Sequence, residues 1–222
     1  MVVGTECWAL LVDWSGIGDF LTGLGAVGAA GAAAFGLSTW RKELSFRRNT
    51  VLAESILLAA FGVEKALNEI RNPFVEPWET ALGEPLDISF FSGDIEYRSY
   101  LAYLPFEARI QKHASAFSQL DEFLPRARAL LGVEVSTAML HLGNAVGEIR
   151  TSISSARFSR SAYEEIVTGE TPTSELLEKA QRHAQHQREA DAVIQHFGSD
   201  DFGKDVWKRV QLLQRLLTKY IG

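Results

Sequence analysis

Three arginines in the second half of the sequence stand close enough together to bind an anion. Arg150, Arg157 and Arg160 are separated by steps of seven and three, which place them near one face of a helix. Arginine forks and hydroxyls suit phosphate groups, so a nucleotide or anionic-lipid site is one interpretation. A solvated helix face, paired with acidic neighbours, is the alternative. The interleaved hydroxyls belong to Ser152, Ser154, Ser155, Ser159 and Ser161.

The histidines give weaker support for a metal site. His183 and His186 are three apart on an expected helix, a spacing that can bring both onto one metal ion. Two ligands are too few for a closed site, and the sequence contains no His-Glu-x-x-His pattern. We therefore interpret them as surface residues and expect no metal.

Motifs for catalysis are missing from the sequence. It has no glycine-rich phosphate loop, no nucleophile elbow and no paired acidic motif in a characteristic frame. Cys7 is the single cysteine, so an intrachain disulfide cannot form. The net charge of −6 argues against general binding of nucleic acid. We expect neither an enzyme nor a cofactor.

An uncharged run over residues 20–40 is the clearest feature among the elements that would position these side chains. Its 21 residues match the roughly 20 that a helix needs to cross a bilayer. A buried helix of a soluble protein and a cleaved signal peptide are the other interpretations. The signal peptide is disfavoured because residues 1–19 contain no Lys or Arg.

Basic residues follow the run and none precede it. This asymmetry predicts a single-pass protein of the inner membrane, with its N-terminus outside and residues 41–222 in the cytoplasm. The lipid bilayer would then be a partner. The basic residues are Arg41, Lys42, Arg47 and Arg48.

Small residues recur every four positions within the run. This spacing lets helix backbones approach closely and supports association within lipid. The insertion free energy of the larger apolar residues is only about −3 kcal/mol, so a packed helix would be more stable than a lone one. We therefore expect a homo-oligomer. The candidate packing residues are Gly25, Gly28, Ala29, Ala32, Ala33 and Gly36.

The rest of the chain divides into a helix, a connector and a helical domain. Residues 1–19 would form a short extracytoplasmic segment, residues 41–71 a juxtamembrane helix with an apolar stripe, and residues 72–94 a connector that begins near Pro73. The aromatic residues of the connector either close the core of the domain or form an exposed docking loop. These aromatic residues are Phe74, Trp78, Phe90 and Phe91.

Residues 95–222 show helical periodicity throughout. A first segment ends near Gly132 and contains Pro105 and Pro125, each expected to kink or restart the helix. Residues 134–165 carry a regular apolar stripe. Thr173 is a good N-cap for the next helix, and Ser199 or Asp200 for the last one. The fold class is therefore all-α, an antiparallel bundle of four or five helices.

Several short motifs are similar to a known group of proteins. They are Trp40 to Leu44, Ile70 to Phe74, Ser199 to Phe202 and the C-terminal Lys219 to Ile221. Together they resemble small uncharacterised bacterial single-pass membrane proteins with a cytoplasmic all-helical domain. The resemblance implies a topology and no catalytic residues.

Three functions follow as hypotheses. The first is a membrane-anchored, self-associating assembly or signalling protein whose cytoplasmic helices bind a protein partner. The second is an oligomeric effector that permeabilises membranes, as in bacterial defence. The third is a cytoplasmic sensor that binds an anionic ligand through the Arg150–Arg160 face.

Overall fold

The all-α prediction is confirmed by the computed structural model. It describes residues 14–76, 79, 93–169, 173–195 and 200–221, with side chains from residue 31 onward. Within these residues it contains six helices and no strand. They form two compact units, Met1–Arg48 (unit 1) and Asn49–Gly222 (unit 2). The helices are α1 (Trp14–Ile70), α3 (Asp94–Lys112), α4 (Ala114–Leu130), α5 (Val133–Thr168), α6 (Ser174–Ile194) and α7 (Asp201–Ile221).

In unit 1 the described structure is a single helix. Every side chain described there, over residues 31–48, is exposed. The hydroxyls of Ser38 and Thr39 donate to the carbonyl of Phe35, and Arg47 forms an ion pair with Glu43 at 2.6 Å. The exposed apolar side chains of this unit are Phe35, Leu37, Trp40, Leu44 and Phe46.

The predicted membrane-spanning helix at residues 20–40 is wrong. Among the residues that the structure describes, no helix combines the length and the apolar character that a bilayer crossing requires. A span needs about 20 apolar residues, and Gly and Ala add little insertion free energy.

The localisation that depended on this helix is also wrong. The single-pass inner-membrane placement, with an outer N-terminus and a cytoplasmic C-terminus, has no helix to support it in the described part of the chain. The four basic residues that suggested this orientation are exposed side chains of α1. They are Arg41, Lys42, Arg47 and Arg48.

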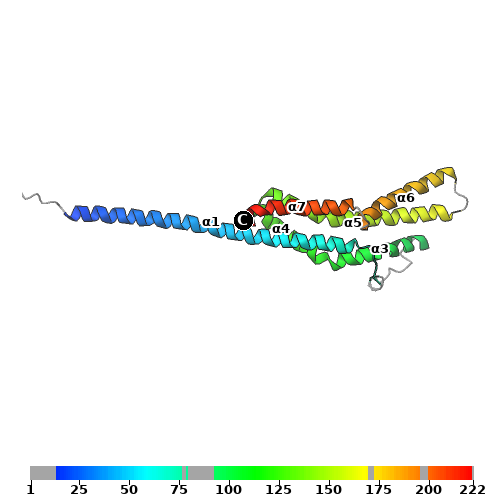
Figure 1. Cartoon of the computed structure of the whole chain (residues 1–222), viewed down its shortest axis with the longest axis horizontal. Helices are drawn as coiled ribbons and strands as arrows, with labels where there is room; N and C mark the ends of the chain where they lie inside the picture. Colours follow the sequence, from blue (N-terminus) through cyan, green and yellow to red (C-terminus); the bar gives the residue numbers. More distant parts are fainter. Residues whose placement is uncertain (1–13, 77–78, 80–92, 170–172, 196–199, 222) are drawn as a thin grey trace, which may run out of the picture. The chain divides into compact units, whose positions relative to one another are not determined.

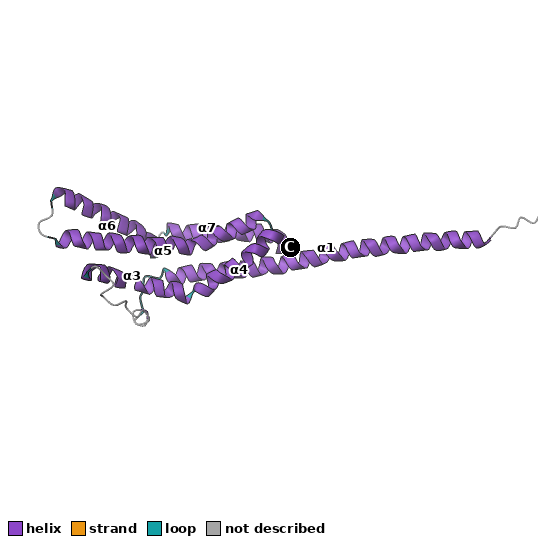
Figure 2. Cartoon of the chain, turned by 180° about the vertical axis from the view of Figure 1, so that it is seen from behind, coloured by secondary structure: helices purple, strands orange, loops and turns teal. Residues whose placement is uncertain are grey.

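Unit 2 is an antiparallel helical bundle. Figures 1 and 2 show α5 and the unit-2 part of α1 running in one direction, and α3–α4 and α6–α7 running back. The α5 helix contacts α3, α4, α6 and α7. The hydroxyl of Thr50 donates to the carbonyl of Tyr220 at 2.7 Å, which joins the start of this part of α1 to the end of α7.

The core lies where the apolar stripes of these helices meet. Residues three or four apart share a helix face, so each stripe buries one side and leaves the other to solvent. The α5 stripe expected from the sequence is buried throughout, and so is the inner part of the α7 stripe. Those residues are Val135, Ala138, Leu142, Ala145, Ile149, Ile153 and Ala156 in α5, and Val206, Val210, Leu213 and Leu217 in α7.

Local signals explain two of the helix ends, the end of α4 and the start of α6. Gly132 adopts a φ of 101°, and its N–H donates to the carbonyl of Ala127 at 3.0 Å, which ends α4. Thr173 caps α6, because its hydroxyl accepts the N–H of Leu176 at 3.3 Å. Neither proline restarts a helix: Pro105 and Pro125 lie inside α3 and α4, and the break between these helices comes at His113.

The core assignment predicts a sharp contrast between two neighbouring leucines of α7. Leu213 is fully buried and Leu212 is exposed. Leu213→Ala should lower the free energy of unfolding by about 2–5 kcal/mol, because it leaves a cavity. Leu212→Ala should change it by less than about 0.5 kcal/mol. Urea unfolding followed by circular dichroism measures both, and equal losses would contradict the assignment.

Candidate functional site

Within unit 2, α1 has apolar side chains on two opposite faces. Its inner face lies in the core and includes Ile56, Val63 and Ile70. At 100° per residue, Leu58 lies about 160° around the helix from Ile56, and Val51 lies about 140° from it. Leu58 is 73% exposed, and Val51 is also exposed. A bundle helix normally buries one apolar stripe. Among the described residues, no helix packs against the second, outer stripe of α1. We call this second stripe the outer face of α1.

The outer face follows a heptad spacing. Steps of seven and of three or four connect its members, as in helices that pair along their length. Glu54 and Lys65 are the charged positions, and both are exposed. Nζ of Lys65 lies 3.8 Å from Oε1 of Glu69. This ion pair is long and exposed to solvent, so it restrains the Lys65 side chain only weakly. The outer face consists of Val51, Glu54, Leu58, Phe61, Lys65 and Asn68.

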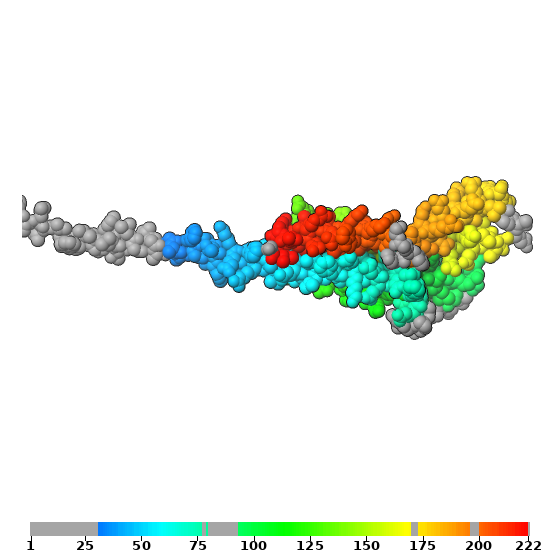
Figure 3. Space-filling model, viewed as in Figure 1, coloured from blue at the N-terminus to red at the C-terminus, as the bar shows by residue number. Residues whose placement is uncertain are grey.

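A groove extends the outer face to the end of α1. Its volume is about 650 Å³, and its walls come from α1 and from the residues that follow it. Phe61 lines one end, and Pro73 and Phe74 line the other. Phe74 is 79% exposed, so this end of the groove carries an unburied aromatic ring. Figure 3 shows this part of the chain in cyan, on the surface of the bundle.

A buried arginine fixes the C-terminal end of α1 to α6 and α7. Arg71 is 1% exposed and binds both carboxylate oxygens of Asp200, at 2.5 and 2.8 Å. Its other N–H groups donate to the carbonyls of Ala192, Val193 and Gln195. These carbonyls end α6 and have no partner within the helix, so Arg71 caps α6 from outside.

The approach of the Asp200 carboxylate requires a glycine in α7. A Cβ on Gly203 would lie 2.1 Å from Oδ2 of Asp200 and 3.3 Å from Nη1 of Arg71. The carboxylate cannot move aside, because Arg71 holds both of its oxygens. Glycine at position 203 therefore allows the ion pair to sit against the first turn of α7.

A second buried arginine fixes the backbone beyond α1. Arg109 of α3 binds both carboxylate oxygens of Glu79 at 2.5 Å, and each of these side chains is 5% exposed. Arg109 also donates to the carbonyls of Ile70, Asn72 and Phe74. The guanidinium of Arg109 holds the pKa of Glu79 below its usual range through this hydrogen bonding.

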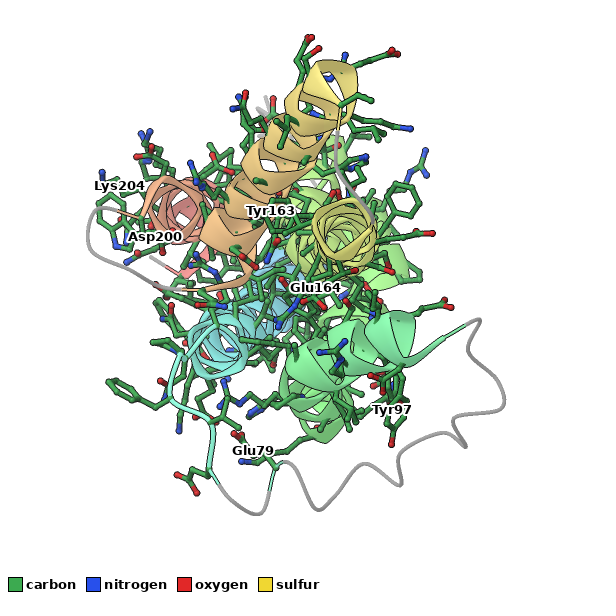
Figure 4. All side chains as sticks on the ribbon, turned by 90° about the vertical axis from the view of Figure 1, so that its right-hand side faces the viewer. Glu79, Tyr97, Tyr163, Glu164, Asp200 and Lys204 are labelled. Carbon is green, nitrogen blue, oxygen red and sulfur yellow. The ribbon has the colours of Figure 1, made fainter. Side chains whose placement is uncertain are left out.

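The two arginine–carboxylate pairs lie on different sides of the same helix end. Figure 4 labels Glu79 and Asp200, which flank the C-terminal end of α1. One pair connects this end to α6 and α7, and the other connects it to α3. Bidentate pairs of this kind specify geometry as well as energy. They hold the groove residues Pro73 and Phe74 at a fixed position relative to α1.

The three predicted anion-binding arginines have three different surroundings. Arg150 is exposed. Arg157 lies over the ring of Tyr100, with its guanidinium carbon 4.8 Å from the ring centre. Arg160 donates to Glu164 at 3.0 Å. Their joint role in anion binding stays a prediction.

A buried tyrosine and a half-buried aspartate form a pair near Arg160. The hydroxyl of Tyr103 in α3 donates to Oδ1 of Asp191 in α6 at 2.9 Å. Burial raises the pKa of both groups, because each loses the water that would stabilise its charged form. The positive charge of Arg160 opposes both shifts. The pair therefore connects α3 to α6 through a hydrogen bond that depends on the hydroxyl keeping its proton.

The remaining predicted sites lie partly outside the described residues. Of the docking-loop candidates, Phe74 is exposed in the groove, whereas Trp78, Phe90 and Phe91 lie outside the described residues. Side chains at 25, 28 and 29 also lie outside them. Ala32, Ala33 and Gly36 are exposed, and a Cβ on Gly36 would meet nothing within 4 Å.

His183 and His186 belong to no metal cluster in the described part of the chain. There, no group of three or more His, Cys, Asp or Glu side chains is placed to hold a metal ion. His183 instead packs edge-on against Phe158, with ring centres 6.0 Å apart.

Sequence reasoning missed the buried arginines. Arg71 was noted only within the motif from Ile70 to Phe74, and Asp200 only as a helix cap. A signal was available: an arginine directly after the last buried position of an amphipathic stripe is well placed to reach other helix ends. Nothing in the sequence connected Arg109 to Glu79, 30 residues earlier.

Comparison with models of protein families, with curated proteins and with solved structures finds no match for this chain. A function therefore has to be inferred from the geometry and chemistry of its side chains.

The buried pair Arg71–Asp200 should matter far more than a surface pair. Arg71→Ala leaves the Asp200 carboxylate buried without its partner, which should cost about 3–5 kcal/mol of unfolding free energy. Arg98 pairs with Asp94 on the surface of α3, so Arg98→Ala should cost less than about 0.5 kcal/mol. Chemical denaturation measures both. A loss for Arg71→Ala as small as that for Arg98→Ala would contradict a stabilising role of the Arg71–Asp200 pair.

The lowered pKa of Glu79 predicts how the stability of the chain changes at acid pH. Its pKa is lowered in the folded state, so the stabilisation is present above its unfolded pKa of 4.5 and is lost as the pH falls through the folded value. Glu79→Gln should therefore be less stable than the original chain at pH 7, and the difference should shrink below about pH 4.5. Unfolding midpoints measured from pH 7 to pH 3 test this, and a constant difference would contradict it.

Proposed function

We propose that this chain is a self-associating assembly module, in which the outer face of α1 pairs with the outer face of a second copy. The single observation that carries the proposal is the heptad run of exposed side chains from Val51 to Asn68, on a helix whose other face is already buried. When a bundle helix has apolar side chains on two faces, one face packs in the core and the apolar side chains of the other face stay in contact with water. A second copy offers a matching surface of the same length.

The charges on this face support an antiparallel arrangement. If a two-fold axis passes between Ala59 and Ala60, Leu58 lies opposite Phe61 of the second copy, and Glu54 lies opposite its Lys65. Each contact then occurs twice, as an isologous interface requires. Val51 meets the aliphatic part of Asn68 at both ends of the interface. Apolar residues occupy the centre and opposite charges flank them.

A parallel pairing would be disfavoured by the same residues. In register, Glu54 would face Glu54 and Lys65 would face Lys65, and like charges in contact destabilise a helix pair. The charge pattern therefore favours the antiparallel dimer over the parallel one.

The buried arginine pairs support this function indirectly. A helix that presents an interface must keep its inner face anchored while the outer face binds. Arg71 and Arg109 hold the last turn of α1 to the other helices, so the outer face and the groove are ordered before association. Binding surfaces that are ordered in advance lose less conformational entropy on association.

This proposal retains the self-association expected from the sequence and moves it to another surface. The small residues between 25 and 36 were expected to pack together within lipid, an expectation that depended on a membrane-crossing helix. Association through the outer face of α1 needs no lipid. A protein partner other than a second copy would compete for the same surface and would be an outcome of the experiments below.

Disruption of the central contact should dissociate the dimer. Leu58→Glu places a charge in both symmetry-related contacts and should raise the Kd about a hundredfold, from loss of about 2–3 kcal/mol of apolar burial. Leu140 of α5, which is 47% exposed, provides the matched control as Leu140→Glu. Sedimentation velocity over about 1–100 μM measures the association, because this range covers a Kd on the order of micromolar. A monomeric original chain, or equal effects of both variants, would contradict the proposal.

A charge exchange tests the orientation. Lys65→Glu should weaken the dimer, because two carboxylates would then meet at each end of the interface. The double variant with Glu54→Lys and Lys65→Glu should restore association, since opposite charges meet again. In a parallel dimer neither change would alter the like-charge contacts, so three equal Kd values would contradict the antiparallel arrangement.

A further inference from the structure

A second region, between α3 and α5, is built around a buried hydroxyl without a partner. Ser99 lies in the interior of α3 and is 1% exposed. Its Oγ has no hydrogen-bond partner among the described residues. A buried hydroxyl in this state loses the full free energy of its hydration, so it calls for a bound molecule or water. Other mid-helix hydroxyls, such as that of Thr151, donate to a carbonyl one turn earlier.

Ser99 lines a cavity that both helices enclose. The volume is about 340 Å³, within the range of pockets for small molecules. The walls are formed by two residues of α3 and four of α5. They are Glu96, Ser99, Ser154, Arg157, Phe158 and Ser161. Five of the six are polar, which distinguishes this cavity from a gap in an apolar core.

Arg157 provides the positive charge. The guanidinium lies over the ring of Tyr100, which fixes its position without neutralising it. No carboxylate of the described residues lies within ion-pair distance of it, in contrast to Arg160, Arg209, Arg71 and Arg109. Its planar fork of N–H donors is suited to a carboxylate or phosphate.

We infer that this cavity binds a small molecule through an oxyanion, a carboxylate or a phosphate, held by Arg157 and by the hydroxyl of Ser99. Glu96 lines the same wall, so the side chains lining the cavity carry one positive and one negative charge. That balance favours a monoanion or a zwitterion over a multiply charged ligand. Phe158 gives the ligand an apolar surface on one side.

The inference is independent of the self-association proposal. The cavity belongs to α3 and α5, whereas the outer face belongs to α1. A chain that dimerises without binding an anion, or binds one without dimerising, would separate the two.

Binding can be tested with inorganic phosphate, acetate and L-serine as probes of the phosphate, carboxylate and zwitterion chemistries. Isothermal titration of the full chain, at constant ionic strength set with chloride, should show saturable binding of at least one probe with a Kd of about 1 mM or tighter. Arg157→Gln should weaken that binding at least tenfold. Arg128→Gln, on the exposed surface of α4 and away from the cavity, should leave it unchanged.

Ser99→Ala separates a role in binding from a role in folding. Removal of a buried hydroxyl without a partner should not lower the melting temperature. The same variant should weaken binding of the probe severalfold. The inference is overturned if no probe binds saturably to the original chain, or if Arg157→Gln and Ser99→Ala bind as tightly as the original chain does.

Discussion

The fixed end of α1 is the constraint on which the rest of unit 2 depends. Arg71 and Arg109 each place a guanidinium among backbone carbonyls that no helix can satisfy, and each carries a buried carboxylate partner. Arg71 caps the end of α6 and binds Asp200 at the start of α7, while Arg109 caps the end of α1. These two side chains therefore connect three helix ends. Buried ion pairs contribute little net stability compared with apolar residues of the same size. Their effect here is to allow one arrangement of these ends, since any other would leave a charge buried without its partner.

This constraint explains how α1 can carry two apolar stripes. The inner stripe joins the core with α5 and α7, and the two arginine pairs prevent the helix from rotating to bury the outer stripe instead. Rotation would also bury Glu54, Lys65 and Asn68, which is costly for polar groups without partners. The outer face of α1 therefore stays exposed in a single copy, and a second copy with the same heptad spacing can cover it. The cavity around Ser99 lies on other helices and adds a separate binding chemistry.

Much of the bundle could be predicted from the sequence, because the signals are local. The stripes of α5 and α7, the cap at Thr173 and the turn at Gly132 each depend on residues within a few positions of one another. The arginine pairs could not be predicted in this way, since Arg71 and Asp200 are 129 residues apart. The prediction of a membrane span was wrong for a different reason: residues 20–40 carry no charge, but Gly and Ala make up half of that run.

The distance between two copies of Asn68 tests the central claim most directly. With a spin label on Asn68→Cys, in a chain that also carries Cys7→Ser, pulsed electron resonance reports this distance. An antiparallel pair centred between Ala59 and Ala60 separates the two labels by about 25 Å along the helix axis, at 1.5 Å per residue. Helices packed about 8–10 Å apart bring the total to about 27 Å. A distance near 10 Å would indicate a parallel pair, and the absence of any coupling between copies would contradict self-association through the outer face of α1.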